Sequence, residues 1–142
     1  MNGSSDTMLL KIYSDGASRG NPGPSAAAFL VLDDHGKVLH SSSRFLGERT
    51  NNQAEYEALV SALDYVSDLS FKEVACYLDS ELVVNQVNGK YTVRNPELKK
   101  LWVKVENVKR RFAKISFIHV RRTNKYVEEV DAMVNRTLDR AS

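Results

Sequence analysis

The order of apolar and polar residues in the first third of the chain predicts three strands. Apolar stretches cover Met8–Ser14, Ser25–Asp33 and Lys37–Phe45. Asp33-Asp34-His35-Gly36, between the second and third stretches, has the composition of a tight hairpin turn. Three consecutive alanines, at positions 26–28, indicate that another element approaches the second strand closely. We therefore expect an antiparallel three-stranded meander.

Helical and strand patterns alternate in the rest of the chain. Thr50-Asn51-Asn52-Gln53 fits a capping box, so a helix should begin there and run to about Ser67. Strands following helices require crossovers, so the later strands should lie parallel to the first. The prediction is an α/β fold with a mixed five-stranded sheet, three strands antiparallel and then two parallel. The later elements are a strand at Val74–Leu78, helices at Ser80–Val87 and from Pro96 to about Phe112, a strand at Ile115–Val120 and a helix at Tyr126–Asp139.

Length and composition fit a single globular domain. The chain has 142 residues, of which 42% are hydrophobic and 27% charged. We expect residues 1–7 to form a flexible tail and residues 8–142 to form the domain. The chain has no apolar run of membrane-spanning length, and its first residues lack the pattern of a signal peptide. Its single cysteine, Cys76, lies in an apolar run and is expected to fill the core in a reducing, cytoplasmic environment.

Charge is distributed unevenly along the chain. Residues 1–88 carry a net charge of −6, residues 89–125 carry +10 and residues 126–142 carry −2. An acidic part joined to a basic segment suggests metal chemistry in one and polyanion binding in the other. Solvated helix faces would explain the same charges without any binding role.

Two acidic residues in the first helix differ in their expected surroundings. Glu55 shares a helical stripe with Leu59 and Leu63, the face that must pack on the sheet. Glu57 lines up with Ser61 and Asp64 and should face solvent. A carboxylate on an apolar face is costly unless a cation compensates it. Glu55 is therefore a candidate metal ligand.

Three further acids can join Glu55. Asp131 shares a stripe with Val127 and Val134 on the last helix, while Asp15 and Asp79 follow strands that should end at the same sheet edge. Four carboxylates without a histidine or cysteine cluster suit Mg²⁺ or Mn²⁺ better than zinc. Sites of this kind commonly hold two ions that act on a phosphoryl group. Each acid taken alone could instead cap a helix or pair with a cation.

The four acids belong to a series of short motifs, and in these motifs the chain resembles type 1 ribonuclease H from about Leu9 to Leu138. Each motif is modest alone, but their order and spacing are specific. The resemblance implies a ribonuclease H-like fold with helices on both sheet faces and metal ligands at the four acids. The matching motifs are Ser14-Asp15-Gly16, Gly20-Asn21-Pro22-Gly23-Pro24, Thr50-Asn51-Asn52-Gln53-Ala54-Glu55, Asp79-Ser80, Asn124 and Val130-Asp131-Ala132.

The resemblance also implies a reaction and a substrate. Members of this family cleave the RNA strand of RNA–DNA hybrids by attack of a metal-activated water, leaving 5′-phosphate and 3′-hydroxyl ends. Asparagine amides can pair with the 2′-hydroxyls that distinguish RNA from DNA. Thr50 matches a position that helps seat a DNA phosphate, although it could serve only as a helix cap. The substrate-binding residues expected on this basis are Gly16, Ser18, Asn21, Thr50, Asn51, Asn52 and Arg121.

The chain departs from the family pattern in two places. Many members carry a histidine in the loop before the last acid, where this chain has Arg121; His119 lies two residues earlier. His119 and Asn124 are therefore possible auxiliary residues, and His119 could equally be a simple strand-end residue. Some members insert a basic helical protrusion where this chain has only residues 88–96. Trp102 has the spacing of a core residue rather than of a stacking platform.

The sequence thus predicts a monomeric endoribonuclease that acts on RNA–DNA hybrids with two Mg²⁺ ions, for which Mn²⁺ could substitute, and that has no membrane partner. The basic helix from Lys99 to Arg111 would hold the hybrid through contacts that do not depend on base sequence. Two alternatives remain at this point. The chain could be a non-catalytic nucleic-acid-binding module, or another nuclease with the same fold.

Overall fold

The computed structural model of the chain describes residues 9–69 and 73–142. The expected tail, residues 1–7, and the expected first strand residue Met8 lie outside these ranges. The structure contains five strands and four helices in the described ranges. They are β1 (Leu9–Ser18), β2 (Gly23–Leu32), β3 (Val38–Arg49), α1 (Asn51–Ser67), β4 (Glu73–Leu78), α2 (Glu81–Val87), α3 (Pro96–Lys109), β5 (Lys114–His119) and α4 (Lys125–Ala141).

The strands form one mixed sheet with the order β3-β2-β1-β4-β5. β1 pairs antiparallel with β2, and β2 pairs antiparallel with β3. β1 and β4 run parallel, as do β4 and β5. The predicted fold class is confirmed, because the meander comes first and both later strands enter through helical crossovers.

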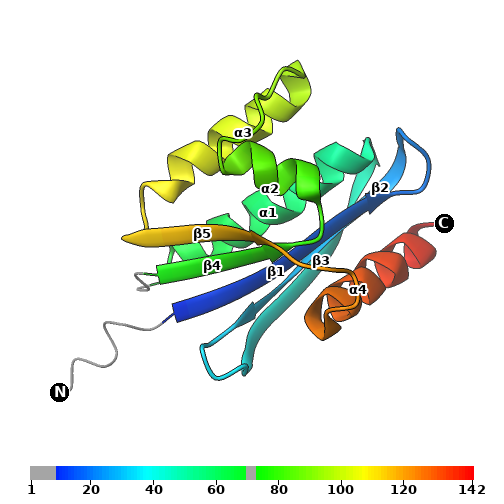
Figure 1. The fold of residues 1–142 in the computed structure, drawn as a ribbon. Helices are drawn as coiled ribbons and strands as arrows, with labels where there is room; N and C mark the ends of the chain where they lie inside the picture. Colours follow the sequence, from blue (N-terminus) through cyan, green and yellow to red (C-terminus); the bar gives the residue numbers. More distant parts are fainter. Residues whose placement is uncertain (1–8, 70–72) are drawn as a thin grey trace.

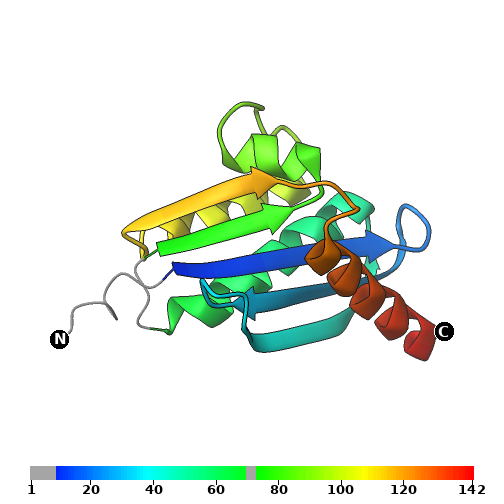
Figure 2. The ribbon, with the colours of Figure 1, turned by 60° about the horizontal axis from the view of Figure 1, so that its bottom comes forward.

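Helices cover both faces of the sheet. α1 and α3 lie on one face and α4 crosses the other (Figure 1), and the turned view separates the two layers clearly (Figure 2). The core on the α1 face includes Leu10, Ile12 and Leu59, and the core on the α4 face includes Leu30 and Val130. Apolar residues on both faces of the central strands explain why β2 is almost continuously hydrophobic.

The three alanines of β2 allow helices to approach the sheet closely, as predicted. Ala27 packs against Ala54 and Ala58 of α1. Ala26 and Ala28 point to the opposite face, into the cluster beneath α4. The small side chain of Ala27 therefore allows the N-terminal end of α1, which carries Glu55, to lie close to the sheet.

Strand β1 is longer than the sequence predicted, and this corrects the expected position of Asp15. β1 continues to Ser18, so Asp15 lies within the strand rather than at its end. Pairing with β2 extends from Lys11 to Ser18 and carries β1 through Asp15. Apolar periodicity could not show this, because the extra residues are polar or small.

The caps of the helices agree with the sequence pattern. Thr50 Oγ1 accepts from the N–H of Gln53 at 3.1 Å, and Gln53 Oε1 accepts from the N–H of Thr50 at 2.8 Å. This reciprocal pair is the predicted capping box. Asn95 and Asn124 cap α3 and α4 by a simpler contact, in which the asparagine side chain accepts from N–H groups of the first helical turn. In the described ranges no helix is both long enough and apolar enough to cross a membrane.

The expected solvent exposure of Glu57 is wrong. The side chain is 16% exposed, and its Oε2 lies 2.6 Å from Nε of Arg49. Its Oε1 also lies 3.9 Å from Arg44, so two arginines of β3 meet one carboxylate of α1. The helical wheel placed Glu57 correctly away from the core, but it could not show that Arg44 and Arg49 of β3 lie beside this face of α1.

Candidate active site

Three of the four predicted acids meet at one end of the central strands. Asp15 comes from β1, Glu55 from the first turns of α1 and Asp79 from the residue after β4. One carboxylate oxygen from each residue lies within 4.8 Å of the other two. Asp15 and Glu55 are each only 6% exposed. A buried group of three carboxylates is costly unless a cation joins it.

The end of the β1–β4 pairing opens the space for this cluster. The parallel pairing stops at Tyr13 and Tyr77, so β1 continues beyond its neighbour. The N–H of Gly16 then donates to Oε1 of Glu55 at 2.9 Å. This hydrogen bond fixes the glutamate carboxylate over the free edge of β1.

Gly16 is required because of the close approach of α1. A Cβ atom at this position would lie 2.1 Å from the carbonyl oxygen of Ala54. No side chain fits there without displacing the start of the helix. The predicted motif residue Gly16 therefore sets the distance between Asp15 and Glu55.

Burial and mutual repulsion raise the pKa of two of the acids. Burial, followed by the charge of Asp79, raises the pKa of Asp15 to about 7. Burial, followed by the charge of Asp15, also raises the pKa of Glu55 well above its ordinary value. The cluster therefore resists full ionisation in the absence of a compensating cation.

Asp79 has one satisfied and one unsatisfied carboxylate oxygen. Its Oδ2 lies 3.2 Å from Nε of Arg122, while the side chain is only 8% exposed. Its buried Oδ1 has no hydrogen-bond partner among the described residues. An unpaired carboxylate oxygen beside two other carboxylates fits a hard divalent cation, which prefers oxygen ligands.

Asp131 does not join the three-acid cluster in the described structure, and its expected inward orientation is wrong. The residue is exposed, one position past the buried Val130 at the margin of the apolar stripe of α4. It borders a recess of about 250 Å³ together with Asp79, Arg122 and Val127. Its negative charge contributes to the raised pKa of Asp15, so it lies in the field of the cluster.

The turn after β1 is tied to the start of α1 by three of the predicted substrate residues. The N–H of Ser18 donates to Oδ1 of Asn51 at 3.2 Å. The N–H of Asn51 in turn donates to Oδ1 of Asn21 at 3.0 Å. Both asparagine carbonyl oxygens are thus used internally. Their NH₂ groups have no hydrogen-bond partner within residues 9–69 and 73–142, so they can donate to a ligand.

Two more predicted substrate residues lie at the start of α1, and two glycines of the matching motif shape the turn after β1. Thr50 caps α1, and Asn52 is half-buried in the first turn of that helix. Gly23 serves the turn itself, because its Cβ would lie 2.4 Å from the carbonyl oxygen of Arg19. Gly20 adopts a φ of 108°, which disfavours any other residue.

The loop after β5 contains a residue that the sequence did not single out. Arg121 is exposed, whereas the neighbouring Arg122 contacts Asp79. His119 is exposed at the last position of β5. Asn124 Oδ1 accepts from the N–H groups of Tyr126 and Val127 at 2.9 and 3.2 Å, so it positions α4. Which of two adjacent arginines reaches the site depends on loop geometry, and no sequence signal distinguished them.

The basic helix α3 presents its charges to solvent. Lys100 and Lys109 pair with Glu97 and Glu106 one turn away, at 3.5 and 3.0 Å. Trp102 packs against the core, and its Nε1–H donates to the carbonyl oxygen of Gln86 at 3.3 Å. Trp102 is therefore half-buried and packed on the core, which agrees with the prediction in position but not in full burial.

Comparison with known proteins agrees with this architecture. The family model described as reverse transcriptase-like matches residues 13–136. Ribonuclease HI of Halobacterium salinarum is 37% identical over 129 residues, covering 91% of this chain and 64% of that protein. The bifunctional protein Rv2228c of Mycobacterium tuberculosis is 39% identical over 137 residues, which cover 95% of this chain but only 37% of that protein.

Solved structures give the same result. The N-terminal RNase H domain of Rv2228c superposes with a TM-score of 0.90 at 35% identity, covering 95% of this chain and 96% of that one. LC11-RNase H1, solved in complex with an RNA/DNA hybrid, gives a TM-score of 0.85 at 39% identity, with coverages of 93% and 98%. The chain therefore belongs to the reverse transcriptase-like family and, within it, to the type 1 ribonucleases H.

Proposed function

We propose that the chain is an endoribonuclease that hydrolyses the RNA strand of RNA–DNA hybrids, leaving 5′-phosphate and 3′-hydroxyl ends. The observation that carries this proposal is the buried meeting of Asp15, Glu55 and Asp79 within 4.8 Å on a ribonuclease H fold. A protein that only bound nucleic acid would gain nothing from three negative charges beside a phosphate backbone.

Asp15, Glu55 and Asp79 would hold divalent cations, with Asp131 as a further ligand at the open side of the site. Two Mg²⁺ ions, or Mn²⁺ in their place, suit this all-oxygen donor set. Bound there, the metal would activate the attacking water and offset the charge that develops on the phosphoryl group and leaving oxygen. The raised pKa of Asp15 and Glu55 supports the proposal, because cation binding would relieve the repulsion that causes it.

The residues around the acids would position the hybrid. Asn21 and Asn51 lie on a turn that their own hydrogen bonds hold in place. Their NH₂ groups, which have no partner among the described residues, would donate to ribose 2′-hydroxyls. The same part of β1 carries Gly16 and Ser18, and the same first turn of α1 carries Asn52. Thr50 and Arg121 would contact phosphates of the hybrid.

His119 and Asn124 would act only as auxiliary groups. The exposed cations of α3 would add binding that depends on salt rather than on base sequence. The relative LC11-RNase H1 was solved in complex with an RNA/DNA hybrid, which supports the same class of substrate here.

A substrate comparison tests the proposal. The protein should cleave a labelled RNA–DNA hybrid in Mg²⁺ or Mn²⁺, leave duplex RNA and duplex DNA of the same sequence intact, and stop when EDTA is added. End analysis of the RNA fragments should show 5′-phosphates. Binding of the hybrid without cleavage would support a non-catalytic module, and cleavage of the other duplexes would indicate another nuclease activity.

A further inference from the structure

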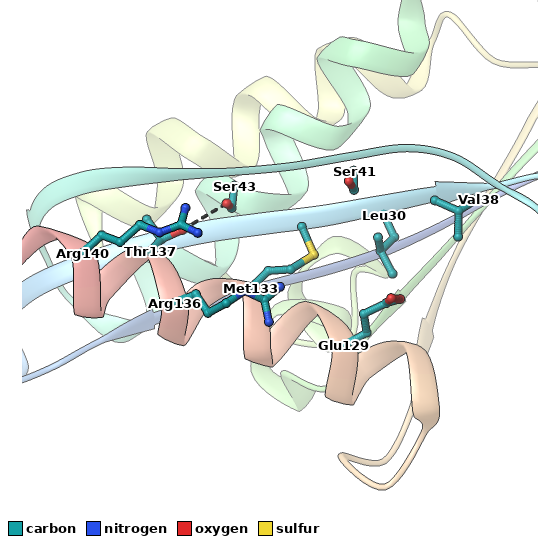
Figure 3. Close-up of a pocket in the computed structure, with 9 residues that line it drawn as sticks. All are labelled: Leu30, Val38, Ser41, Ser43, Glu129, Met133, Arg136, Thr137 and Arg140. Carbon is teal, nitrogen blue, oxygen red and sulfur yellow. Dashed lines mark hydrogen bonds between the residues drawn. The ribbon is translucent and has the colours of Figure 1, made fainter.

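A groove between the edge strand β3 and helix α4 lies outside the site described above. It has a volume of about 290 Å³ and is lined by Leu30, Val38, Ser41, Ser43, Glu129, Met133, Arg136, Thr137 and Arg140. Figure 3 shows Arg140 extending toward Thr137 and Ser43, with Arg136 lying along α4 beside Met133. Leu30, 2% exposed, forms an apolar floor.

Arg136 and Arg140 stand one turn apart on α4, where two like charges repel each other. Within residues 9–69 and 73–142 neither arginine lies within ion-pair distance of a carboxylate. Arg19, by contrast, reaches Asp139 on the same helix at 2.7 Å. The two groove arginines thus have no ion-pair partner among the described residues and lie above an apolar floor, with Glu129 as the one acid among the residues that line the groove. Guanidinium groups in such settings bind phosphate oxygens in a bidentate manner.

Hydroxyl groups of β3 complete the cationic end of the groove. Thr137 Oγ1 donates to Oγ of Ser43 at 3.0 Å, which leaves the Ser43 O–H available to donate to an anion. Ser41 lies two residues earlier on the same face of β3 and also lines the groove. Glu129 lies near Val38 at the other end (Figure 3), where it would repel an anion but accept from a sugar hydroxyl.

We infer that this groove binds a phosphate group, with Arg136 and Arg140 as anion ligands and Ser43 as a hydrogen-bond donor. The ligand class is inorganic phosphate or the phosphate of a small phosphorylated molecule such as a nucleoside monophosphate. The groove does not belong to the acidic site, because Arg140 follows Asp131 by nine residues and points about 180° away around the helix. The inference therefore stands independently of the proposed nuclease activity.

Nuclear magnetic resonance titration at constant ionic strength tests the inference. Inorganic phosphate and AMP should each produce saturable shifts of the Nε–H signals of Arg136 and Arg140 and of the backbone amides of Ser41 and Ser43, whereas adenosine alone should not. Stronger binding of phosphate would identify the free ion as the ligand, and stronger binding of AMP would identify a phosphorylated metabolite.

Matched variants separate a built site from general charge attraction. Arg136→Gln/Arg140→Gln should weaken phosphate binding by about tenfold or more, because the charge-assisted hydrogen bonds of both guanidinium groups are lost. Lys90→Gln/Arg94→Gln removes the same charge from exposed positions outside the groove and outside α3, and should leave the affinity unchanged. Arg136→Lys/Arg140→Lys should retain intermediate affinity and serves as the test if the glutamine variant does not fold. Non-saturable shifts, equal losses in both glutamine variants or equal binding of adenosine would overturn the inference.

Discussion

Replacing Asp15 by asparagine should stabilise the metal-free protein. The fold holds this carboxyl 6% exposed, beside Glu55 and Asp79, and raises its pKa from an ordinary 3.8 to about 7. A difference of one in pKa between the folded and unfolded states corresponds to about 1.4 kcal/mol. Ionised Asp15 therefore costs the folded state up to about 4 kcal/mol at pH 8. Asparagine keeps the shape and removes that charge.

The pH dependence has a definite sign. The folded state holds the Asp15 proton more tightly than the unfolded state, so the penalty is fully present above pH 7 and disappears as the pH falls toward 3.8. The stability gained by Asp15→Asn should therefore be largest at pH 8 and small near pH 4. Magnesium should also reduce the gain, because a bound cation compensates the carboxylate in the wild-type protein.

Urea unfolding in the presence of EDTA, followed by circular dichroism at pH 8, 6 and 4, measures this effect. Asp64→Asn is the matched control, because Asp64 is exposed on α1 and its replacement should change stability by less than about 0.5 kcal/mol. A variant no more stable than the wild type at pH 8 would refute the account of Asp15, as would a gain that does not change with pH.

Three other predictions follow from the same geometry. Gly16→Ala should destabilise the protein by about 1–3 kcal/mol and reduce cleavage, because its Cβ would lie 2.1 Å from the Ala54 carbonyl; thermal unfolding and a cleavage assay report both effects. Thr50→Ala removes the cap of α1 and should cost about 1 kcal/mol, while Thr50→Ser should retain most of that stability in the same unfolding measurement. Raising NaCl from 50 to 200 mM should weaken hybrid binding steeply in a fluorescence-anisotropy titration, and a flat salt profile would exclude the cations of α3 as a binding surface.

The sequence predicted the fold well because its signals are local. Period-two and continuous apolar runs marked the strands, and the capping box at Thr50 marked the start of α1 at the correct residue. Asp79 was placed correctly after β4, since an apolar run visibly ends there. The wheel position of Glu55 among buried residues was also sufficient to identify it as an unusual acid.

What the sequence could not show depends on contacts between distant segments. β1 extends past Asp15 because β2 pairs with it, which its own polar residues do not indicate. Glu57 is held by arginines of β3, and Asp79 by Arg122 rather than by Arg121. Asp131 shares the apolar stripe by spacing but lies at its exposed margin, because a wheel does not show where a helix overhangs the sheet.

The most direct test of the central claim is single-turnover cleavage of an RNA–DNA hybrid in Mg²⁺ by the wild type and by Asp79→Asn, together with the hybrid affinity of each protein. Asp79 supplies the buried oxygen of the three-acid cluster that has no hydrogen-bond partner in the described part of the chain. We predict that the variant loses cleavage and binds the hybrid with nearly unchanged affinity, while Asp64→Asn cleaves as the wild type does. Full cleavage by Asp79→Asn would contradict the assignment of the acidic cluster as the catalytic site.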